Sequence, residues 1–310
     1  MVINFLLNTF SKNKSCKAIV WQNRYYDYQW LEERFFFYES EIKKNKLINQ
    51  GSIVILEADF TPNSIALLLV LINQNCIIVP ITESVNNKKD EFILISQGEV
   101  SIKISDKDKL NISSLGTIAQ HDIYDELRKK SAPGLVLFSS GSSGKSKASV
   151  HNIKSLLEKY KIPRNKYNAI TFLLFDHIGG FNTLFYILSN AGLIITVNNR
   201  RPDNVMKMIQ NHNAELLPTT PTFINLILLS EAYLKYNISS LKIITYGTEP
   251  MPYTTLKKLN LLLPKVKLVQ TYGLSEVGIL RSKSRSSDSL WVKVGGEEFQ
   301  TRVRNKELEI

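Results

Sequence analysis

The sequence predicts an α/β fold with two packed, parallel-rich βα-layered sheets, helices on both faces, and the start of a small β subdomain. Three observations predict it. Short apolar segments of strand character alternate with helical segments of about 10–15 residues, the pattern of parallel sheets built from βα units. Apolar residues make up 44% and charged residues 22%, which is typical of globular rather than disordered chains. The 310 residues are enough for two or three units with sizeable cores.

The first half is expected to begin with two strands and a helix and to continue as βα units. A helix is expected after Pro62, because proline suits the first turn. The polar stretch 105–131 is interpreted as a connection between two sheets. The expected elements are strands at 17–21, 25–28, 53–57 and 76–80, and helices at 29–44, 63–73 and 88–97.

The second half resumes the alternation. Residues 281–289 are basic and serine-rich, which predicts a loop, and 291–310 predicts two short strands. The expected division is a first α/β subdomain at 1–130, a second with the binding motifs at 131–280, and a linker with an incomplete β subdomain at 281–310. The expected elements are strands at 135–139, 169–174, 192–197, 215–217, 241–246 and 266–271, and helices at 152–159, 180–190, 203–211, 220–232 and 253–262.

Composition excludes several classes of protein. Two cysteines exclude a disulfide framework and a cysteine-rich zinc site, and the four histidines form no metal-binding pair. The longest apolar run, 65–72, is too short for a membrane span, and the N-terminus lacks signal-peptide features, so we expect a cytoplasmic protein. The net charge of +11 suggests a phosphate-bearing partner. No nucleic-acid partner is expected, because basic and aromatic residues are not interleaved.

The most informative segment is a Ser/Gly-rich loop after the strand at 135–139, with a helix expected behind it. Small residues let backbone N–H groups approach a phosphate, and Lys145 and Lys147 add positive charge. A flexible linker is the alternative. The segment is not a P-loop, because GxxxxGK[ST] requires a glycine where Ser139 stands. Its residues are Ser139, Ser140, Gly141, Ser142, Ser143, Gly144, Lys145, Ser146 and Lys147.

This loop resembles the signature [ST]-S-G-[ST]-[ST]-G-x-[PS]-K of the adenylate-forming superfamily, which includes acyl-CoA synthetases, peptide-synthetase adenylation domains and luciferases. It matches every class position, and Ala148 replaces the usual following glycine. The resemblance implies that the loop wraps the β- and γ-phosphates of ATP, with Lys147 as its cation.

A second motif of the superfamily follows at 175–180, where FDHIGG resembles an aromatic residue followed by H-x-G-G at a helix start. The resemblance implies that His177 contacts the acyl carboxylate or the adenylate, and makes it a candidate catalytic residue. The alternative is a helix-entry loop in which Asp176 caps the helix and His177 is structural.

Two more motifs follow in the superfamily's order. Residues 247–250, GTEP, resemble a GAEP turn beside adenine, which assigns Gly247, Thr248 and Glu249 to nucleotide binding. An ordinary strand-end turn is the alternative. All motifs are expected beyond the carboxyl ends of strands, where open α/β sheets bind ligands.

The last motif, YGLSE at 272–276, resembles YGxTE, for which a βα turn is the alternative. By the resemblance, Tyr272 packs on adenine, Gly273 belongs to the same cofactor site, and Ser275 contacts the α-phosphate. Glu276 is the expected Mg²⁺ ligand and a second candidate catalytic residue.

The resemblance implies ATP-dependent activation of a small carboxylic acid to acyl-AMP and pyrophosphate, then transfer to the thiol of CoA or of carrier-protein phosphopantetheine. A fatty or aryl acid is expected, and fatty acid metabolism is the expected context. Phe181, Thr222 and Phe223 are candidate walls of the acyl pocket. The alternative is an inactive nucleotide-binding or interaction module that keeps the fold.

Superfamily members usually continue into a ribose-binding motif and a C-terminal domain with a catalytic lysine. The chain is therefore expected to be the N-terminal part of a longer enzyme, lacking its own C-terminal domain. We expect the part to turn over poorly alone, because that lysine stabilises charge during adenylation.

Overall fold

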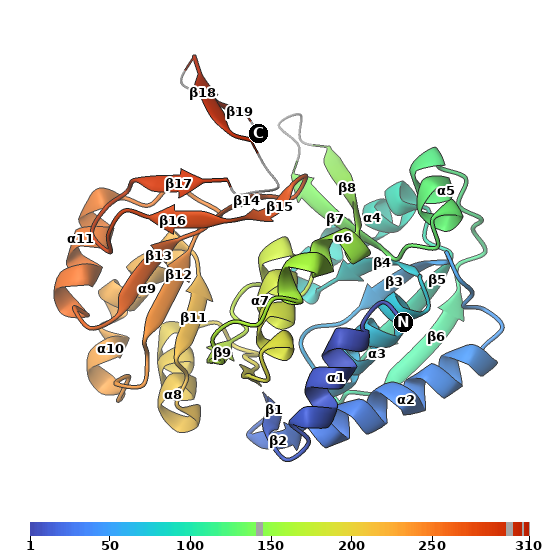
Figure 1. Cartoon of the computed structure of the whole chain (residues 1–310), viewed down its shortest axis with the longest axis horizontal. Coiled ribbons are helices and arrows are strands. Elements are labelled where there is room, and N and C mark those ends of the chain that lie inside the picture. The colour runs from blue at the N-terminus through green and yellow to red at the C-terminus, as the bar shows by residue number, and fades with distance from the viewer. Residues whose placement is uncertain (141–144, 296–299, 306, 310) are drawn as a thin grey trace. The chain divides into compact units, whose positions relative to one another are not determined.

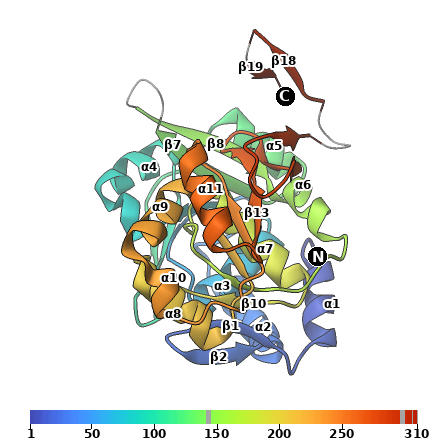
Figure 2. The same cartoon turned by 90° about the vertical axis from the view of Figure 1, so that its left-hand side faces the viewer.

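The computed structural model describes residues 1–140, 145–295, 300–305 and 307–309, and the chain divides into two compact units. The first unit comprises residues 1–166 and 174–196, and the second comprises 167–173 and 197–310. Figure 1 and Figure 2 show their elements. The division differs from the expected boundary at 130/131, because the two strands around the Ser/Gly loop pair with the first sheet.

A six-stranded sheet forms the centre of the first unit, in the order β6-β5-β3-β4-β7-β8. Its four inner strands are parallel, and the two edge strands are antiparallel to their neighbours. The inner strands are rich in Ile, Val and Leu, as expected where both faces are covered. The strands are β3 (Ile53–Glu57), β4 (Ile77–Ile81), β5 (Val100–Ile104), β6 (Leu110–Ser114), β7 (Gly134–Ser140) and β8 (Ser146–Asn152).

The remaining elements of the first unit are helices and a group of three strands, in which β1 pairs in parallel with β10 and antiparallel with β2. Helix α3 (Pro62–Asn73) contains the long apolar run, and every residue from 65 to 72 is buried. That run is therefore a core helix. The others are α1 (Asn4–Lys12), β1 (Lys17–Trp21), β2 (Arg24–Asp27), α2 (Tyr28–Lys44), the 3-10 helix η1 (Glu83–Lys88), α4 (Lys89–Ser96), α5 (Asp122–Lys129), α6 (Ile153–Leu157), the 3-10 helix η2 (Glu158–Tyr160), α7 (Ile178–Ser189) and β10 (Leu193–Ile195).

The first unit corrects three expectations. Helix α1 was not expected. The stretch 105–131 is not merely a connection, because it contains β6, which has no buried residue, and α5, a short helix with charged ends that buries Tyr124 and Leu127. The segment after the Ser/Gly loop is strand β8 rather than a helix. The sequence of β8 is polar and lacks the apolar pattern of a buried strand, but the strand pairs with β7 along its full length.

The second unit contains a parallel array in the order β13-β12-β11-β9. The predicted α/β fold with parallel-rich sheets is confirmed in both units. The elements are β9 (Asn168–Ile170), α8 (Pro202–His212), β11 (Leu216–Thr219), α9 (Pro221–Ser230), α10 (Ala232–Lys235), β12 (Ile243–Tyr246), α11 (Tyr253–Leu262) and β13 (Lys267–Gln270).

Three antiparallel hairpins follow β13. They correct the expectation of a loop at 281–289, because this segment contains β16. Its serines bond to the β13 backbone: the backbone N–H of Gln270 donates to the Ser284 hydroxyl at 2.7 Å, and the Ser282 hydroxyl donates to the Gln270 carbonyl at 3.0 Å. The strands are β14 (Tyr272–Leu274), β15 (Gly278–Leu280), β16 (Ser282–Ser284), β17 (Val292–Val294), β18 (Arg302–Arg304) and β19 (Glu307–Glu309).

In the part of the chain that the structure describes, no helix combines the length and apolarity that a membrane crossing requires.

Candidate functional site

The Ser/Gly loop connects β7 and β8, which we call the phosphate hairpin (residues 134–152). Ser139 and Ser140 end β7, opposite Lys147 and Ser146 in the antiparallel register. The Lys147 side chain is exposed on β8. The other predicted loop residues, Gly141, Ser142, Ser143 and Gly144, lie outside the described residues.

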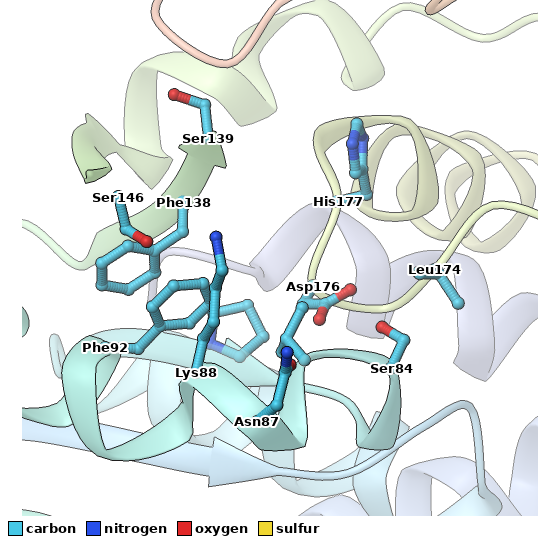
Figure 3. A pocket seen from close by; sticks show the side chains of 12 residues that line it. Ser84, Asn87, Lys88, Phe92, Phe138, Ser139, Ser146, Leu174, Asp176 and His177 are labelled. Atoms are coloured by element: carbon cyan, nitrogen blue, oxygen red, sulfur yellow. The ribbon is translucent and has the colours of Figure 1, made fainter. Parts of the chain in front are cut away.

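A pocket of ≈ 260 Å³ lies beside this hairpin in the first unit (Figure 3). One wall is apolar, because the rings of Phe92 and Phe138 stack with centroids 3.8 Å apart and planes within 2° of parallel. The pocket brings Ser139 together with His177, two residues that the sequence assigned to one site. Its lining residues are Pro80, Ser84, Val85, Asn87, Lys88, Phe92, Phe138, Ser139, Ser146, Leu174, Asp176 and His177.

His177 is the N-cap residue of α7 by its backbone, and its side chain makes no capping hydrogen bond. Asp176 does not cap the helix, in contrast to the structural alternative. One of its carboxylate oxygens accepts hydrogen bonds from the backbone N–H of Thr82 at 3.1 Å and from the Thr82 hydroxyl at 2.7 Å. Burial raises the pKa of Asp176, while these bonds and His177 oppose the rise. Asp176 therefore joins the His177 loop to the chain after β4.

The second unit holds the other predicted residues at two strand ends. Gly247 follows β12, and a side chain there would meet the Thr271 hydroxyl oxygen at 2.6 Å and its carbonyl oxygen at 2.7 Å. Thr271 is itself bound to Tyr246, because its backbone N–H donates to the Tyr246 carbonyl at 2.8 Å. Thr248 has a φ of 72°, an uncommon backbone conformation for a β-branched residue. The turn thus combines a close backbone approach with local strain.

Of the candidate acyl-pocket walls, Thr222 is exposed, and its hydroxyl donates to the Glu249 carboxylate at 2.5 Å. Phe223 is buried, and its ring lies 4.1 Å from that of Phe172. In the first unit, Phe181 is also buried and packs on Phe185. Their role in an acyl pocket stays a prediction.

The last motif forms a β-hairpin rather than a βα turn. Tyr272 and Gly273 lie in β14, which pairs with β15, and Ser275 and Glu276 form the turn between the strands. Gly273 is required by packing, since a side chain would meet the carbonyl oxygen of Gly278 at 2.8 Å.

Glu276 is exposed, and the described residues contain no cluster of three metal-ligating side chains. A single carboxylate fits Mg²⁺, which usually takes one or two protein carboxylates together with phosphates and waters. The donor chemistry of Glu276 therefore fits the expected ion.

Sequence reasoning did not identify several pocket residues, namely Ser84, Asn87, Lys88 and Phe92. They come from η1 and α4, which carry no motif. Their only signal is their position after the buried strand β4, whose carboxyl end faces the side of the sheet where ligands bind.

The chain is similar to known proteins both in sequence and in fold. Residues 49–297 match the AMP-binding enzyme family. A 4-coumarate-CoA ligase 1 of Narcissus pseudonarcissus is 27% identical over 135 residues, covering 43% of this chain and 25% of that protein. Acyl-CoA synthetase 7 of Caenorhabditis elegans is 37% identical over 73 residues, covering 24% of this chain and 14% of that protein. These matches span a quarter or less of the curated relatives.

Solved structures share the fold. The N-terminal subdomain of Klebsiella oxytoca NpsA, in complex with 3-hydroxybenzoyl-AMSN, has a TM-score of 0.73 and 13% identity, covering 89% of this chain and 73% of that one. The N-terminal domain of FACL13 from Mycobacterium tuberculosis has a TM-score of 0.71 and 15% identity, covering 88% and 76%. The family match spans most of the 310 residues, and the four motifs lie at or beyond strand ends. The chain belongs to the AMP-binding enzyme family.

Proposed function

We propose that this chain binds ATP and a carboxylic acid for an acid–thiol ligase. The ligase activates the acid as an acyl-adenylate, releases pyrophosphate, and transfers the acyl group to CoA or to carrier-protein phosphopantetheine. The observation that carries the proposal is the pocket that joins Ser139 of the phosphate hairpin to His177 of the H-x-G-G motif. The family match supports it independently.

In the first unit, the phosphate loop from Ser139 to Gly144 and the Lys147 ammonium bind the β- and γ-phosphates of ATP. His177 contacts the acid or the adenylate from the start of α7. These groups act by positioning and by charge stabilisation, so the protein supplies no nucleophile.

In the second unit, the turn formed by Gly247, Thr248 and Glu249 borders the adenine ring. Tyr272 packs on that ring, with Gly273 allowing the close strand pairing, and Ser275 donates to the α-phosphate. The Glu276 carboxylate holds Mg²⁺, which supplies charge neutralisation between phosphate oxygens.

The acid is a fatty or aryl acid. Support for an aryl acid comes from relatives named as 4-coumarate and 4-chlorobenzoate CoA ligases, the latter 24% identical over 152 residues. The acceptor thiol and a cytoplasmic location remain predictions.

Calorimetric titration of the chain with ATP and AMP tests the nucleotide site. The Lys147→Ala variant should bind ATP roughly ten-fold more weakly, because one charge-assisted contact is lost, while AMP affinity stays unchanged. Lys154→Ala, another exposed lysine in the same unit, is the matched control and should bind ATP like the wild type. Unchanged ATP affinity in Lys147→Ala would contradict the phosphate role.

Pyrophosphate exchange with a panel of aryl and fatty acids tests the chemistry separately. Exchange that depends on the acid identifies an adenylating enzyme and its substrate class. Nucleotide binding with no exchange for any acid would instead favour a non-catalytic nucleotide-binding module.

A further inference from the structure

The pocket of the first unit contains a polar atom that the proposed roles leave unused. Ser146 is 8% exposed, lines the pocket, and its hydroxyl oxygen has no hydrogen-bond partner among the described residues. Its backbone N–H is held separately, donating to a Glu91 carboxylate oxygen at 3.2 Å. A buried hydroxyl without a partner costs about 1–3 kcal/mol. A group so placed on a pocket wall is available to bond to a ligand.

Lys88 is the cation of the same pocket. It ends η1, is half-buried, and makes no ion pair with the residues that the structure describes. Figure 3 shows its chain running beside the stacked rings of Phe92 and Phe138, with the amino group pointing in the direction of Ser139. The next residue, Lys89, is different, because its amino group pairs with Glu57 at 2.6 Å.

Of the described carboxylates, neither Glu91 nor Asp176 forms an ion pair with Lys88. A Glu91 carboxylate oxygen accepts from the Ser146 backbone N–H, and an Asp176 carboxylate oxygen accepts from the Thr82 hydroxyl. Lys88 and the Ser146 hydroxyl are left as donors beside Ser139.

We infer that Lys88 and Ser146 form a subsite for a diphosphate group on the inner side of the phosphate hairpin. The inference rests on the proposed function, because ATP, pyrophosphate and CoA are the diphosphate-containing ligands of that function. Several phosphate oxygens can accept from one ammonium and two hydroxyls at the same time. The diphosphate comes either from the triphosphate tail of ATP, and hence from pyrophosphate, or from CoA.

Calorimetric titrations at fixed ionic strength with pyrophosphate, ATP, AMP, CoA and pantetheine test the subsite. We expect Lys88→Gln to weaken binding of the diphosphate ligand about ten-fold, and Ser146→Ala to weaken it about three-fold. AMP and pantetheine lack a diphosphate, so their affinities should not change. Lys89→Gln removes the same charge one residue away and should bind like the wild type.

The arms of this experiment separate the sources and the failures. Weaker pyrophosphate and ATP binding by Lys88→Gln assigns the subsite to the nucleotide, and weaker CoA binding alone assigns it to the acceptor. Equal affinities of Lys88→Gln and Lys89→Gln for all diphosphate ligands would overturn the inference, and a Ser146→Ala variant with wild-type affinity would overturn the part of Ser146. Failure of the wild type to bind ATP and AMP would overturn the proposed function instead.

Discussion

In the first unit, the side chains of Asp176 and Glu91 hold the pocket walls, whereas in the second unit the turn at Gly247 is held by backbone contacts. Asp176 binds Thr82, and Glu91 binds the backbone of Ser146. Gly247 instead lies so close to Thr271 that no side chain fits between them.

The two units should therefore respond differently to substitutions. The pocket of the first unit contains two polar groups that are available for a ligand, so substitution of Lys88 or Ser146 should change phosphate affinity more than the free energy of unfolding. The turns of the second unit depend on shape. Substitutions there should change the free energy of unfolding first, and nucleotide affinity as a consequence.

Gly247→Ala should have the largest effect on stability. The added methyl group would meet the backbone carbonyl of Thr271 at 2.7 Å, and we expect a loss of about 3 kcal/mol in the free energy of unfolding. Urea unfolding measures it. Gly116→Ala is the control, because that position has a positive φ of 69° but open space around it and should lose only about 1 kcal/mol. Equal losses would show that close approach does not hold the turn.

Glu91→Ala tests the side-chain support of the first unit. It leaves the Ser146 backbone N–H without its acceptor, and we expect a loss of about 1.5 kcal/mol in the free energy of unfolding. Amide hydrogen exchange at Ser146 should become faster. Glu91→Gln retains an acceptor oxygen and should keep most of the protection. Unchanged exchange in Glu91→Ala would mean that the hairpin does not depend on this bond.

The inner strands and the long helices follow from the sequence, because their apolar patterns are strong. The strand expected at 53–57 is β3, and the helix expected at 253–262 is α11. Strand β8 and the strand β16 within 281–289 could not be predicted in this way. Their serines and lysines reach strand geometry only because a partner strand or backbone lies beside them.

The candidate site shows the same limit. The motifs identified Ser139, His177 and Gly247 from the local sequence, since the motif residues lie at strand ends or helix starts. Lys88 and the Ser146 hydroxyl stand out only in the folded chain. The reasons for choosing them are their burial and their lack of hydrogen-bond or ion-pair partners within the described part of the chain, which are properties of the tertiary structure and not of the local sequence.

Thr248→Gly tests the same turn of the second unit by relieving backbone strain, whereas Gly247→Ala adds a methyl group that does not fit. A β-branched residue at a φ of 72° is strained, and glycine adopts that conformation freely, so the variant should gain about 1 kcal/mol in the free energy of unfolding despite its larger unfolded-state entropy. The midpoint of urea unfolding should rise. Thr248→Val, which keeps the branched shape without the hydroxyl, should show no gain. A gain with valine would assign the effect to the hydroxyl rather than to strain.

Asp176→Asn tests the electrostatics of the first unit. We expect the smallest effect here, observed as a change in how the free energy of unfolding depends on pH. Burial raises the pKa of Asp176 above its unfolded value. Its contribution to stability is therefore fully present below the unfolded pKa of about 4 and is lost as pH rises through the folded value. The variant lacks this loss, so its free energy of unfolding should improve relative to the wild type as pH rises above about 4.

Asp288→Asn provides the control of opposite sign for that experiment. The Ser286 hydroxyl lowers the pKa of the exposed Asp288, so its contribution is present above the unfolded pKa and is lost as pH falls. Relative to the wild type, this variant should lose its stability deficit as pH falls below the unfolded pKa of about 4, the side of that pKa on which Asp176→Asn should show no change. A change on the same side of pH 4 for both variants would mean that burial does not govern Asp176, and the electrostatic part of the comparison between the two units would fail.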